Sequence, residues 1–193
     1  MSTLPVPRLV VAVGTDHHPF HRLMRWIEDI IGRGVIPGHQ ALVQFGSSQR
    51  PSNALAQALI PRPELLAQMA QADVVVGHGG PGVIMDARSM GRRPIVVPRL
   101  ARHGEVIDDH QVTFARRLAE SDKIVLAEDS EAFVAAVQRG LAEPDWLAVG
   151  GTQALVSGAD EVAWRIDRLV EELRTTPRTR VVRRIGQLWR SHG

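Results

Sequence analysis

The stretch from residue 72 to residue 98, ADVVVGHGGPGVIMDARSMGRRPIVVP, decides the fold. It predicts a buried strand at 74–76, a glycine-rich turn, a helix at 83–90 and, after a Gly-Arg-Arg-Pro break, a second buried strand at 95–97. A helix that begins at a glycine turn after a strand leaves backbone N–H groups free to gather around a phosphate. The stretch therefore indicates an α/β protein with an anion site at the start of this helix.

Short apolar runs alternate with helix-like patterns through the first 140 residues. The predicted strands lie at residues 9–13, 41–45, 74–76, 95–97 and 124–126. The segment at 54–60 fits a short helix or a strand equally well. The alternation predicts an α/β fold, a Rossmann-like parallel sheet flanked by helices, in which the carboxyl ends of the strands share one edge. The loops at Gly14-Thr15 and Gly77-His78 would then meet at that edge.

The sequence changes character after residue 140. Residues 1–140 are predicted to form one domain, and residues 141–193 to hold a connector, an amphipathic helix at 161–174 and a basic helical tail at 179–190. After Leu173 the chain carries six arginines and no acidic residue. An apolar face among these arginines suits an anionic membrane surface or a partner helix, and peripheral membrane association is one expectation. Packing of the tail onto its own domain is the alternative.

Composition excludes several classes of protein. The chain has no cysteine, which excludes disulfides and thiolate metal sites. No apolar run approaches the ~20 residues that span a bilayer, and no basic segment precedes the first strand, so we expect neither a transmembrane helix nor a signal peptide. The expected compartment is the cytoplasm. Aromatic residues make up 4% of the chain and tyrosine is absent, so surfaces for stacking on nucleic acid bases are sparse and no nucleic acid partner is predicted.

The glycine turn at 77–82 also satisfies G-x-G-x-x-G, and three interpretations compete. A dinucleotide site would need this pattern after the first strand and an acidic residue about 20 residues later. Here the pattern follows a middle strand, although Arg99 could accommodate the 2′-phosphate of NADP. The second interpretation is a phosphate site that uses the free amides of the helix. The third is a tight strand–helix turn without a ligand.

Two polar features accompany the turn. Asp86 lies one helical turn beyond Gly82, where a carboxylate can accept the hydroxyls of a ribose whose phosphates sit at the helix start. A simple interaction with the helix dipole is the alternative. The cluster Asp108-Asp109-His110-Gln111 offers donors and acceptors that suit sugar hydroxyls, although such residues also cap helices without any ligand. Together these features favour a nucleotide-sugar site.

At these residues the chain resembles the C-terminal, donor-binding domain of family-28 glycosyltransferases. The resemblance rests on ADVVVGHGGPGVIMDA at 72–87, on GRRPIVVP at 91–98, on DDHQ at 108–111 and on the opening VAVGTDHHPFHRLMRWI at 11–27. It implies a single donor-binding half of a GT-B glycosyltransferase. The chain looks most like standalone catalytic subunits, of which the bacterial exopolysaccharide glucuronosyltransferases and the eukaryotic dolichol-linked N-acetylglucosaminyltransferase are examples.

The resemblance assigns roles to individual residues. Gly79, Gly80, Pro81 and Gly82 would present the helix start to the diphosphate, and Gly14 and Thr15 would line the phosphates from the first loop. Asp86 would hold the ribose in place of the longer glutamate of the peptidoglycan enzyme. The transferred sugar would be contacted by Asp109, His110 and Gln111. Uracil would lie near the loop that precedes Pro63.

The implied reaction transfers a sugar from a UDP-sugar to a lipid-linked acceptor with inversion. Helix and loop amides would stabilise the departing diphosphate, and without an Asp-x-Asp pair to hold Mg²⁺ we predict no metal and no cofactor. The acceptor needs a general base. His17 and His18 are the first candidates, with His78 and His103 also near the expected edge. A solvated histidine pair is the alternative for His17 and His18.

The remaining expectations concern the donor and the partners. Five arginines crowd the sequence near the expected sugar pocket, which favours UDP-glucuronate beside UDP-N-acetylglucosamine as donor. These arginines are Arg88, Arg92, Arg93, Arg99 and Arg102. The predicted partner is a membrane-anchored, acceptor-binding subunit, which would recruit the chain to the inner face of the membrane. An NADP-dependent oxidoreductase and a non-catalytic nucleotide-sugar-binding regulatory subunit are the alternatives.

Overall fold

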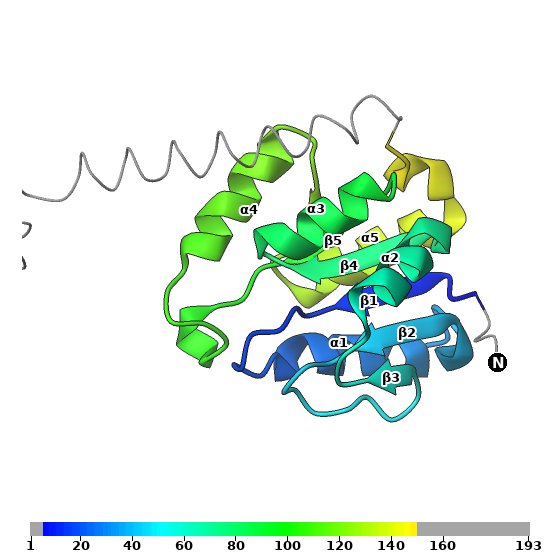
Figure 1. Ribbon diagram of the computed structural model, residues 1–193, viewed down its shortest axis with the longest axis horizontal. Coiled ribbons are helices and arrows are strands. Elements are labelled where there is room, and N and C mark those ends of the chain that lie inside the picture. The colour runs from blue at the N-terminus through cyan, green and yellow to red at the C-terminus, as the bar shows by residue number, and fades with distance from the viewer. Residues whose placement is uncertain (1–5, 150–193) are drawn as a thin grey trace, which may run out of the picture. The chain divides into compact units, whose positions relative to one another are not determined.

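The computed structural model describes residues 6–149 (Figure 1). The chain divides into two compact units, Met1–Leu155 and Val156–Gly193, and the described residues belong to the first. The helices predicted at 161–174 and 179–190 lie outside the described residues. Among residues 6–149, none of the helices combines the length and the apolar character needed to cross a bilayer.

The described unit is built on one six-stranded parallel sheet (Figure 1). Its strands are β1 (Leu9–Ala12), β2 (Ala41–Gln44), β3 (Leu55–Gln57), β4 (Val74–His78), β5 (Ile95–Val97) and β6 (Val125–Leu126). The order across the sheet is β3-β2-β1-β4-β5-β6, with Val10 paired to Leu42 on one side and to Val75 on the other. This is the doubly wound order, and it confirms the predicted Rossmann-like fold.

Helices cover both faces of the sheet. They are α1 (His21–Gly32), α2 (Arg62–Gln71), α3 (Pro81–Ser89), α4 (His110–Glu120) and α5 (Ser130–Ala142). Successive residues of β1 point to opposite faces, as the strand period requires. Leu9 and Val11 belong to the core cluster that includes buried residues of α1 and α5, whereas Val10 and Ala12 belong to the cluster of α2 and α3. Burial on both faces explains why the strands are continuously apolar.

Some element boundaries differ from the sequence prediction. The undecided segment at 54–60 contains the short edge strand β3, which pairs with β2. The sequence pattern of residues 106–120 predicts a helix, but α4 begins only at His110, because Asp108 accepts a hydrogen bond from the backbone N–H of His110 and turns the chain there (3.0 Å). Ser, Asp and Asn side chains commonly compete with helix formation in this way.

The segment after residue 140 packs against the domain as far as it is described. α5 ends at Ala142, and the short 3-10 helix η3 (Pro144–Leu147) follows it. Leu147 is buried in the same core cluster as Leu9 and Phe133, and Arg92 forms an isolated antiparallel bridge with Ala148. The connector predicted from residue 141 therefore begins inside α5, and the domain boundary at residue 140 stays a prediction.

Candidate functional site

The site lies at the carboxyl ends of β1 and β4, the two central strands of the sheet. From β1 the strand order continues through β2 on one side, and from β4 it continues through β5 on the other. The connections diverge at this point, and open α/β sheets bind their ligands in the crevice that results. The loop after β1 carries Gly14 to His18, and the turn after β4 carries Gly79 to Gly82. The two predicted phosphate loops therefore flank one switch point.

The first turn of α3 is open to a ligand. Gly80 precedes the helix with an extended backbone (φ −81°, ψ 139°), and no side chain of residues 6–149 caps the helix. Pro81 suits the first helical position because its missing N–H would have no helical partner there. A Cβ at exposed Gly82 would meet no other atom within 4 Å. The amides of this turn can therefore bind an anion, and the helix dipole favours one.

The ring of His78 joins the two loops. A Cβ at Gly14 would lie 2.6 Å from His78 Cε1, and a Cβ at Gly80 would lie 2.2 Å from His78 Nε2. Gly14 also has a φ of +75°, a conformation that favours glycine. The ring thus occupies the space that two missing side chains leave. Its Nδ1 is buried and has no hydrogen-bond partner among the described residues, which is uncommon for a buried polar atom.

The environment of His78 keeps its ring neutral. The pKa of His78 lies at about 4, below its usual 6.5, because burial and, to a lesser extent, the charge of Arg99 lower it more than a hydrogen bond to the Ala12 backbone and the charge of Asp16 raise it. A neutral imidazole can present a donor or an acceptor to a phosphate or sugar oxygen without carrying a charge. His78 is therefore suited to contact a ligand at this turn.

Acidification should destabilise the protein through His78. Between pH 6.5 and about pH 4 the unfolded chain binds a proton that the folded chain does not, so the free energy of unfolding falls as the pH falls. The difference between the two pKa values corresponds to about 3 kcal/mol. His78→Gln should lose less stability over this window in urea titrations at each pH, whereas His39→Gln, at an exposed position, should behave as wild type. Equal losses in wild type and His78→Gln would contradict the assignment.

Gln111 reaches the same turn from α4. A Cβ at Gly79 would lie 3.0 Å from Gln111 Cβ and 3.3 Å from its Oε1. This Oε1 is a second buried atom without a partner among residues 6–149. Two unpaired polar atoms therefore border the loops: Oε1 of Gln111 lies against Gly79, and Nδ1 of His78 lies 3.4 Å from the Cβ position of Gly14. An unmet hydrogen bond in the interior is costly, and a ligand that supplies both would remove the cost.

The other two residues predicted to contact the sugar are placed differently. Asp109 accepts a hydrogen bond from the backbone N–H of Ala101 (2.9 Å), which ties α4 to the short 3-10 helix η2 (Ala101–His103). His110 is exposed, and its Nε2 lies 3.7 Å from a carboxylate oxygen of Asp108. Neither of these contacts brings its side chain against the glycine turn. Their roles in sugar binding stay predictions.

Asp86, the predicted ribose ligand, already has a partner. Arg62, the first residue of α2, donates to its carboxylate at 2.6 Å. Asp86 is largely covered and Arg62 is exposed, so the guanidinium lies on the solvent side of the pair. Exposed ion pairs contribute little to stability, and a ribose could take the place of Arg62 at low cost. Sequence reasoning did not find Arg62, because its partner lies 24 residues away on another helix.

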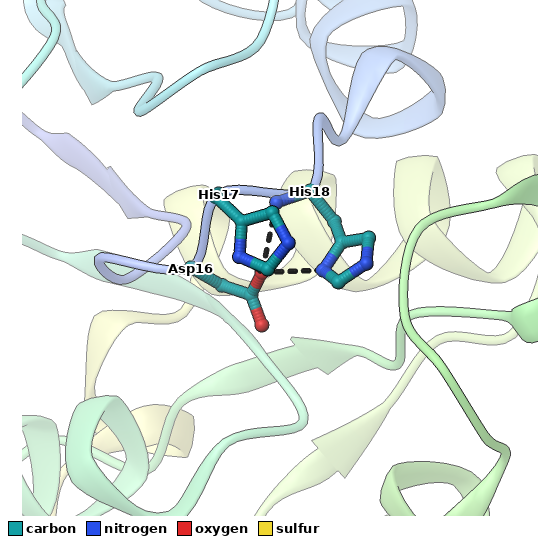
Figure 2. A group of neighbouring side chains, drawn as sticks. All are labelled: Asp16, His17 and His18. Carbon is teal, nitrogen blue, oxygen red and sulfur yellow. Dashed lines mark hydrogen bonds and ion pairs between the residues drawn. The ribbon is translucent and has the colours of Figure 1, made fainter.

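Asp16, His17 and His18 form a group on the β1 loop (Figure 2). Asp16 Oδ1 accepts a hydrogen bond from the His18 backbone N–H (2.8 Å) and lies 2.7 Å from His18 Nδ1. Burial raises the pKa of Asp16, but these bonds and the charges of Arg99 and His18 outweigh it and lower the pKa below its usual value. An ionised Asp16 orients the imidazole of His18, the arrangement that a general base requires. The side chain of His17 is 86% exposed.

The same three residues are the candidates for a metal site. One ligand atom from each of Asp16, His17 and His18 lies within 4.8 Å of the others, and no other such group occurs among residues 6–149. The hydrogen bonds between Asp16 and His18 account for this closeness without an ion. The prediction that no metal is used stays untested.

The arginines predicted to crowd the sugar pocket do not gather there. Arg88 donates to the Lys123 backbone and Arg92 to the Ala70 backbone, both at the opposite edge, where the strands begin. Arg93 pairs with Asp122 at that edge. Arg99 is fully buried, with 0% of its surface exposed. Strand direction therefore separates Arg88, Arg92 and Arg93 from the site, so they do not support a uronic acid donor, and the donor sugar stays a prediction.

The order of the strands defines the class of fold, a doubly wound α/β domain, and an uncapped helix start lies at its switch point. Residues 11–160 match the family model for the glycosyltransferase family 28 C-terminal domain. The chain therefore belongs to this family. A segment of 68 residues is 28% identical to the UDP-N-acetylglucosamine transferase subunit ALG13 of Yarrowia lipolytica and covers 35% of this chain and 33% of that protein.

Solved structures show the same fold. The glycosyltransferase of kitacinnamycin is 17% identical with a TM-score of 0.56, and the alignment covers 89% of this chain and 44% of that one. MurG of Acinetobacter baumannii is 15% identical with a TM-score of 0.52 and coverage of 81% and 46%. The chain thus spans less than half of each of these GT-B enzymes, which confirms the predicted half of a GT-B fold.

Proposed function

We propose that the chain is the donor-binding, catalytic part of an inverting glycosyltransferase that uses a UDP-sugar. The observation that carries this proposal is the uncapped start of α3 at the switch point, beside the ring of His78 and Oε1 of Gln111, which has no partner among residues 6–149. The diphosphate lies on the amides of Gly82 and Val83, and the sugar faces Gln111. Membership of the family supports this interpretation.

The reaction needs charge stabilisation and a base. The acceptor oxygen attacks the anomeric carbon while the bond from that carbon to the β-phosphate oxygen breaks, and the electron pair leaves with UDP. Free amides and the dipole of α3 stabilise this charge, as preorganised dipoles do in other enzymes. His18 Nδ1 donates to Asp16, which leaves Nε2 to take the proton of the acceptor hydroxyl. No metal or cofactor is part of this scheme.

A relative and the sequence resemblance support the proposed donor and acceptor. The similar segment in a UDP-N-acetylglucosamine transferase subunit supports that sugar as donor, and UDP-glucuronate stays as the second candidate from the sequence resemblance. A lipid-linked acceptor in polysaccharide synthesis, such as an exopolysaccharide, fits the same resemblance. The chain works at the inner, cytoplasmic face of a membrane, to which its partner recruits it.

A partner subunit supplies the acceptor half in this proposal. The solved GT-B relatives are more than twice as long as the segment that they share with this chain. Two large apolar side chains are exposed on segments that follow strands of the sheet: Leu59, two residues after β3, and Ile107, between β5 and α4, at 62% and 83% exposure. The proposed partner is a membrane-anchored, acceptor-binding subunit.

The alternatives differ in their ligand. An NADP-dependent oxidoreductase loses its main support, because the buried Arg99 cannot reach a 2′-phosphate. A non-catalytic regulatory subunit keeps UDP-sugar binding but has no turnover. The Asp16–His18 pair favours the enzyme over the regulator, because binding alone would not need an oriented base.

UDP should stabilise the protein, and NADP should not. At a UDP concentration 100-fold above Kd the free energy of unfolding should rise by about 2.7 kcal/mol, which thermal unfolding detects as a higher Tm. The rise should persist with excess EDTA, because the diphosphate is held by amides. A Tm that responds to NADP alone would overturn the proposal, and a UDP response that requires Mg²⁺ would overturn its metal-independent form.

A further inference from the structure

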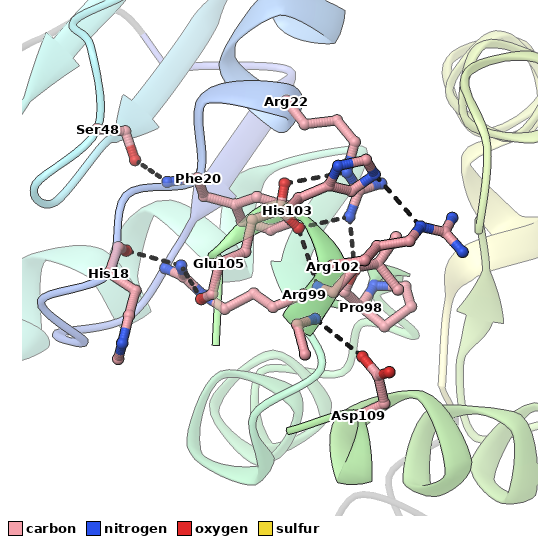
Figure 3. A network of polar contacts seen from close by, with 12 residues as sticks. His18, Phe20, Arg22, Ser48, Pro98, Arg99, Arg102, His103, Glu105 and Asp109 are labelled. Carbon is pink, nitrogen blue, oxygen red and sulfur yellow. Dashed lines mark hydrogen bonds and ion pairs between the residues drawn. The ribbon is translucent and has the colours of Figure 1, made fainter. Parts of the chain in front are cut away.

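Arg99 is a buried cation in the centre of the loops that border the site. Its guanidinium donates to three backbone carbonyls, those of His18 (2.7 Å), Glu105 (3.0 Å) and Val13 (3.1 Å) (Figure 3). Its carbon Cζ lies 4.8 Å from the centre of the Phe20 ring. Arginine is rarely buried completely, so a side chain with 0% exposure and this set of partners has a defined task.

A buried carboxylate completes the group. Glu105 is 3% exposed, and it accepts from Arg22 through both oxygens, at 3.0 Å and 2.8 Å. One of these oxygens also accepts from the backbone N–H of Leu100 (3.0 Å), and Arg22 donates to the Pro98 carbonyl (2.8 Å). Arg22 and Glu105 thus form a buried ion pair with further hydrogen bonds, as buried charges require. Arg99 is held by its three carbonyls, while its Nε has no partner among residues 6–149.

This group connects three segments that are far apart in the sequence. Val13 and His18 belong to the loop after β1, which carries Asp16 and the proposed base. Residues 98–105 follow β5 and lead through Asp109 to α4, which carries Gln111. Arg22 comes from α1. The loop of the base and the loop toward the sugar-binding helix are thus held by one set of buried bonds.

We propose that Arg99, with Glu105 and Arg22, is a positioning residue that fixes His18 relative to the donor site. This inference rests on the proposed function. Arg99 contacts neither donor nor acceptor, because none of its surface is exposed. It acts through the backbone carbonyls of Val13 and His18. Only a planar guanidinium, with several N–H donors in fixed directions, can hold these two carbonyls and that of Glu105 together.

The geometry of the Arg99 guanidinium makes its replacement by lysine informative. Lysine keeps the positive charge but is a compact ammonium on a flexible stem, so it cannot reproduce three directed bonds and the stacking on Phe20. Arg99→Lys therefore separates charge from geometry. Glu105→Gln does the converse, because it keeps the shape of the side chain and removes its charge. Both substitutions leave Gly82, His78 and Asp16 unchanged.

We expect both variants to bind UDP within about threefold of wild type by calorimetry and to lose tenfold or more in kcat with UDP-N-acetylglucosamine and cell membranes as acceptor source. The ring resonances of His18 should shift in NMR spectra of Arg99→Lys. Arg33→Lys is the control, because it makes the same change at an exposed pair with Asp29, and it should match wild type in all three measurements.

Two results would overturn the inference. If Arg99→Lys lowers Tm but leaves the His18 resonances and kcat unchanged, the group only stabilises the fold. If UDP affinity falls as much as kcat, Arg99 acts on the donor instead. Should Arg99→Lys fail to fold, Glu105→Gln carries the same three measurements. A wild-type protein that does not bind UDP would refute the proposed function, whereas the His18 resonances would still report whether Arg99 positions the loop.

Discussion

Replacing Gly82 with aspartate should abolish UDP binding while the fold stays as stable as before. Gly82 occupies the second position of α3, is exposed, and has open space where a Cβ would lie. A carboxylate there interacts favourably with the helix dipole, but it takes the amides that the diphosphate needs and repels its charge. Two like charges about 4 Å apart near a protein surface repel by about 4 kcal/mol. We therefore expect a loss of affinity of about a thousandfold.

The matched control is Gly82→Ala. Alanine fits the same open space and has the higher helix propensity, by up to about 1 kcal/mol, so this variant should be at least as stable as wild type and should bind UDP nearly as well. Calorimetry with UDP and thermal unfolding of both variants measure the two effects separately. Equal affinity in Gly82→Asp and Gly82→Ala would contradict a diphosphate at this helix start.

The sequence predicted the central sheet because its strands are short, continuous apolar runs separated by helical periodicity. Val74–Val76 and Ile95–Val97 could not be mistaken for polar loops. β3 was undecided for a physical reason. It lies at the edge of the sheet, and none of its three residues is fully buried. Edge strands need not be apolar on both faces, so their sequences carry a weaker signal.

Proximity within the site was predictable where strand direction determines it. Parallel strands end at one edge, so Gly14 and Gly80 had to approach each other, and the ring of His78 lies between them. The hydrogen-bond partners of individual side chains were harder to predict. The hydrogen bond of Asp16 with His18 could have been predicted, because a spacing of two residues is typical of such local bonds. The pairing of Arg62 with Asp86 depends on how α2 packs beside α3, which the sequence does not state.

The burial of Arg99 was not predictable from the sequence at all. Charged residues are mostly exposed, so a sequence pattern predicts that an arginine faces solvent or binds a ligand. The structure instead gives Arg99 three carbonyls from two loops and a carboxylate nearby. These partners lie 6 to 86 residues away along the chain, and no periodic pattern links them. For that reason the sequence predicted that Arg99 binds a phosphate or a uronate, and did not predict that it lies inside the protein.

Replacing His18 with alanine should lower turnover by about a hundredfold to ten-thousandfold, the range that general bases contribute. UDP affinity should stay within about twofold, because the diphosphate lies on α3 and not on this ring. Asp16→Asn should produce a smaller loss in kcat, since asparagine can still accept a hydrogen bond but no longer stabilises the imidazolium that forms during the reaction. UDP release from UDP-N-acetylglucosamine in the presence of cell membranes measures turnover.

Two further histidines sharpen this test. His39 precedes β2 at the opposite edge of the sheet, so His39→Ala should leave turnover unchanged. His17 also lies near Asp16, but its Nδ1 is 3.6 Å from the carboxylate and its side chain is 86% exposed. His17→Ala should therefore cost little. The opposite result, with turnover lost in His17→Ala and kept in His18→Ala, would identify His17 as the base. His18 would then transfer no proton in the reaction, and its hydrogen bond with Asp16 would only stabilise the conformation of the loop.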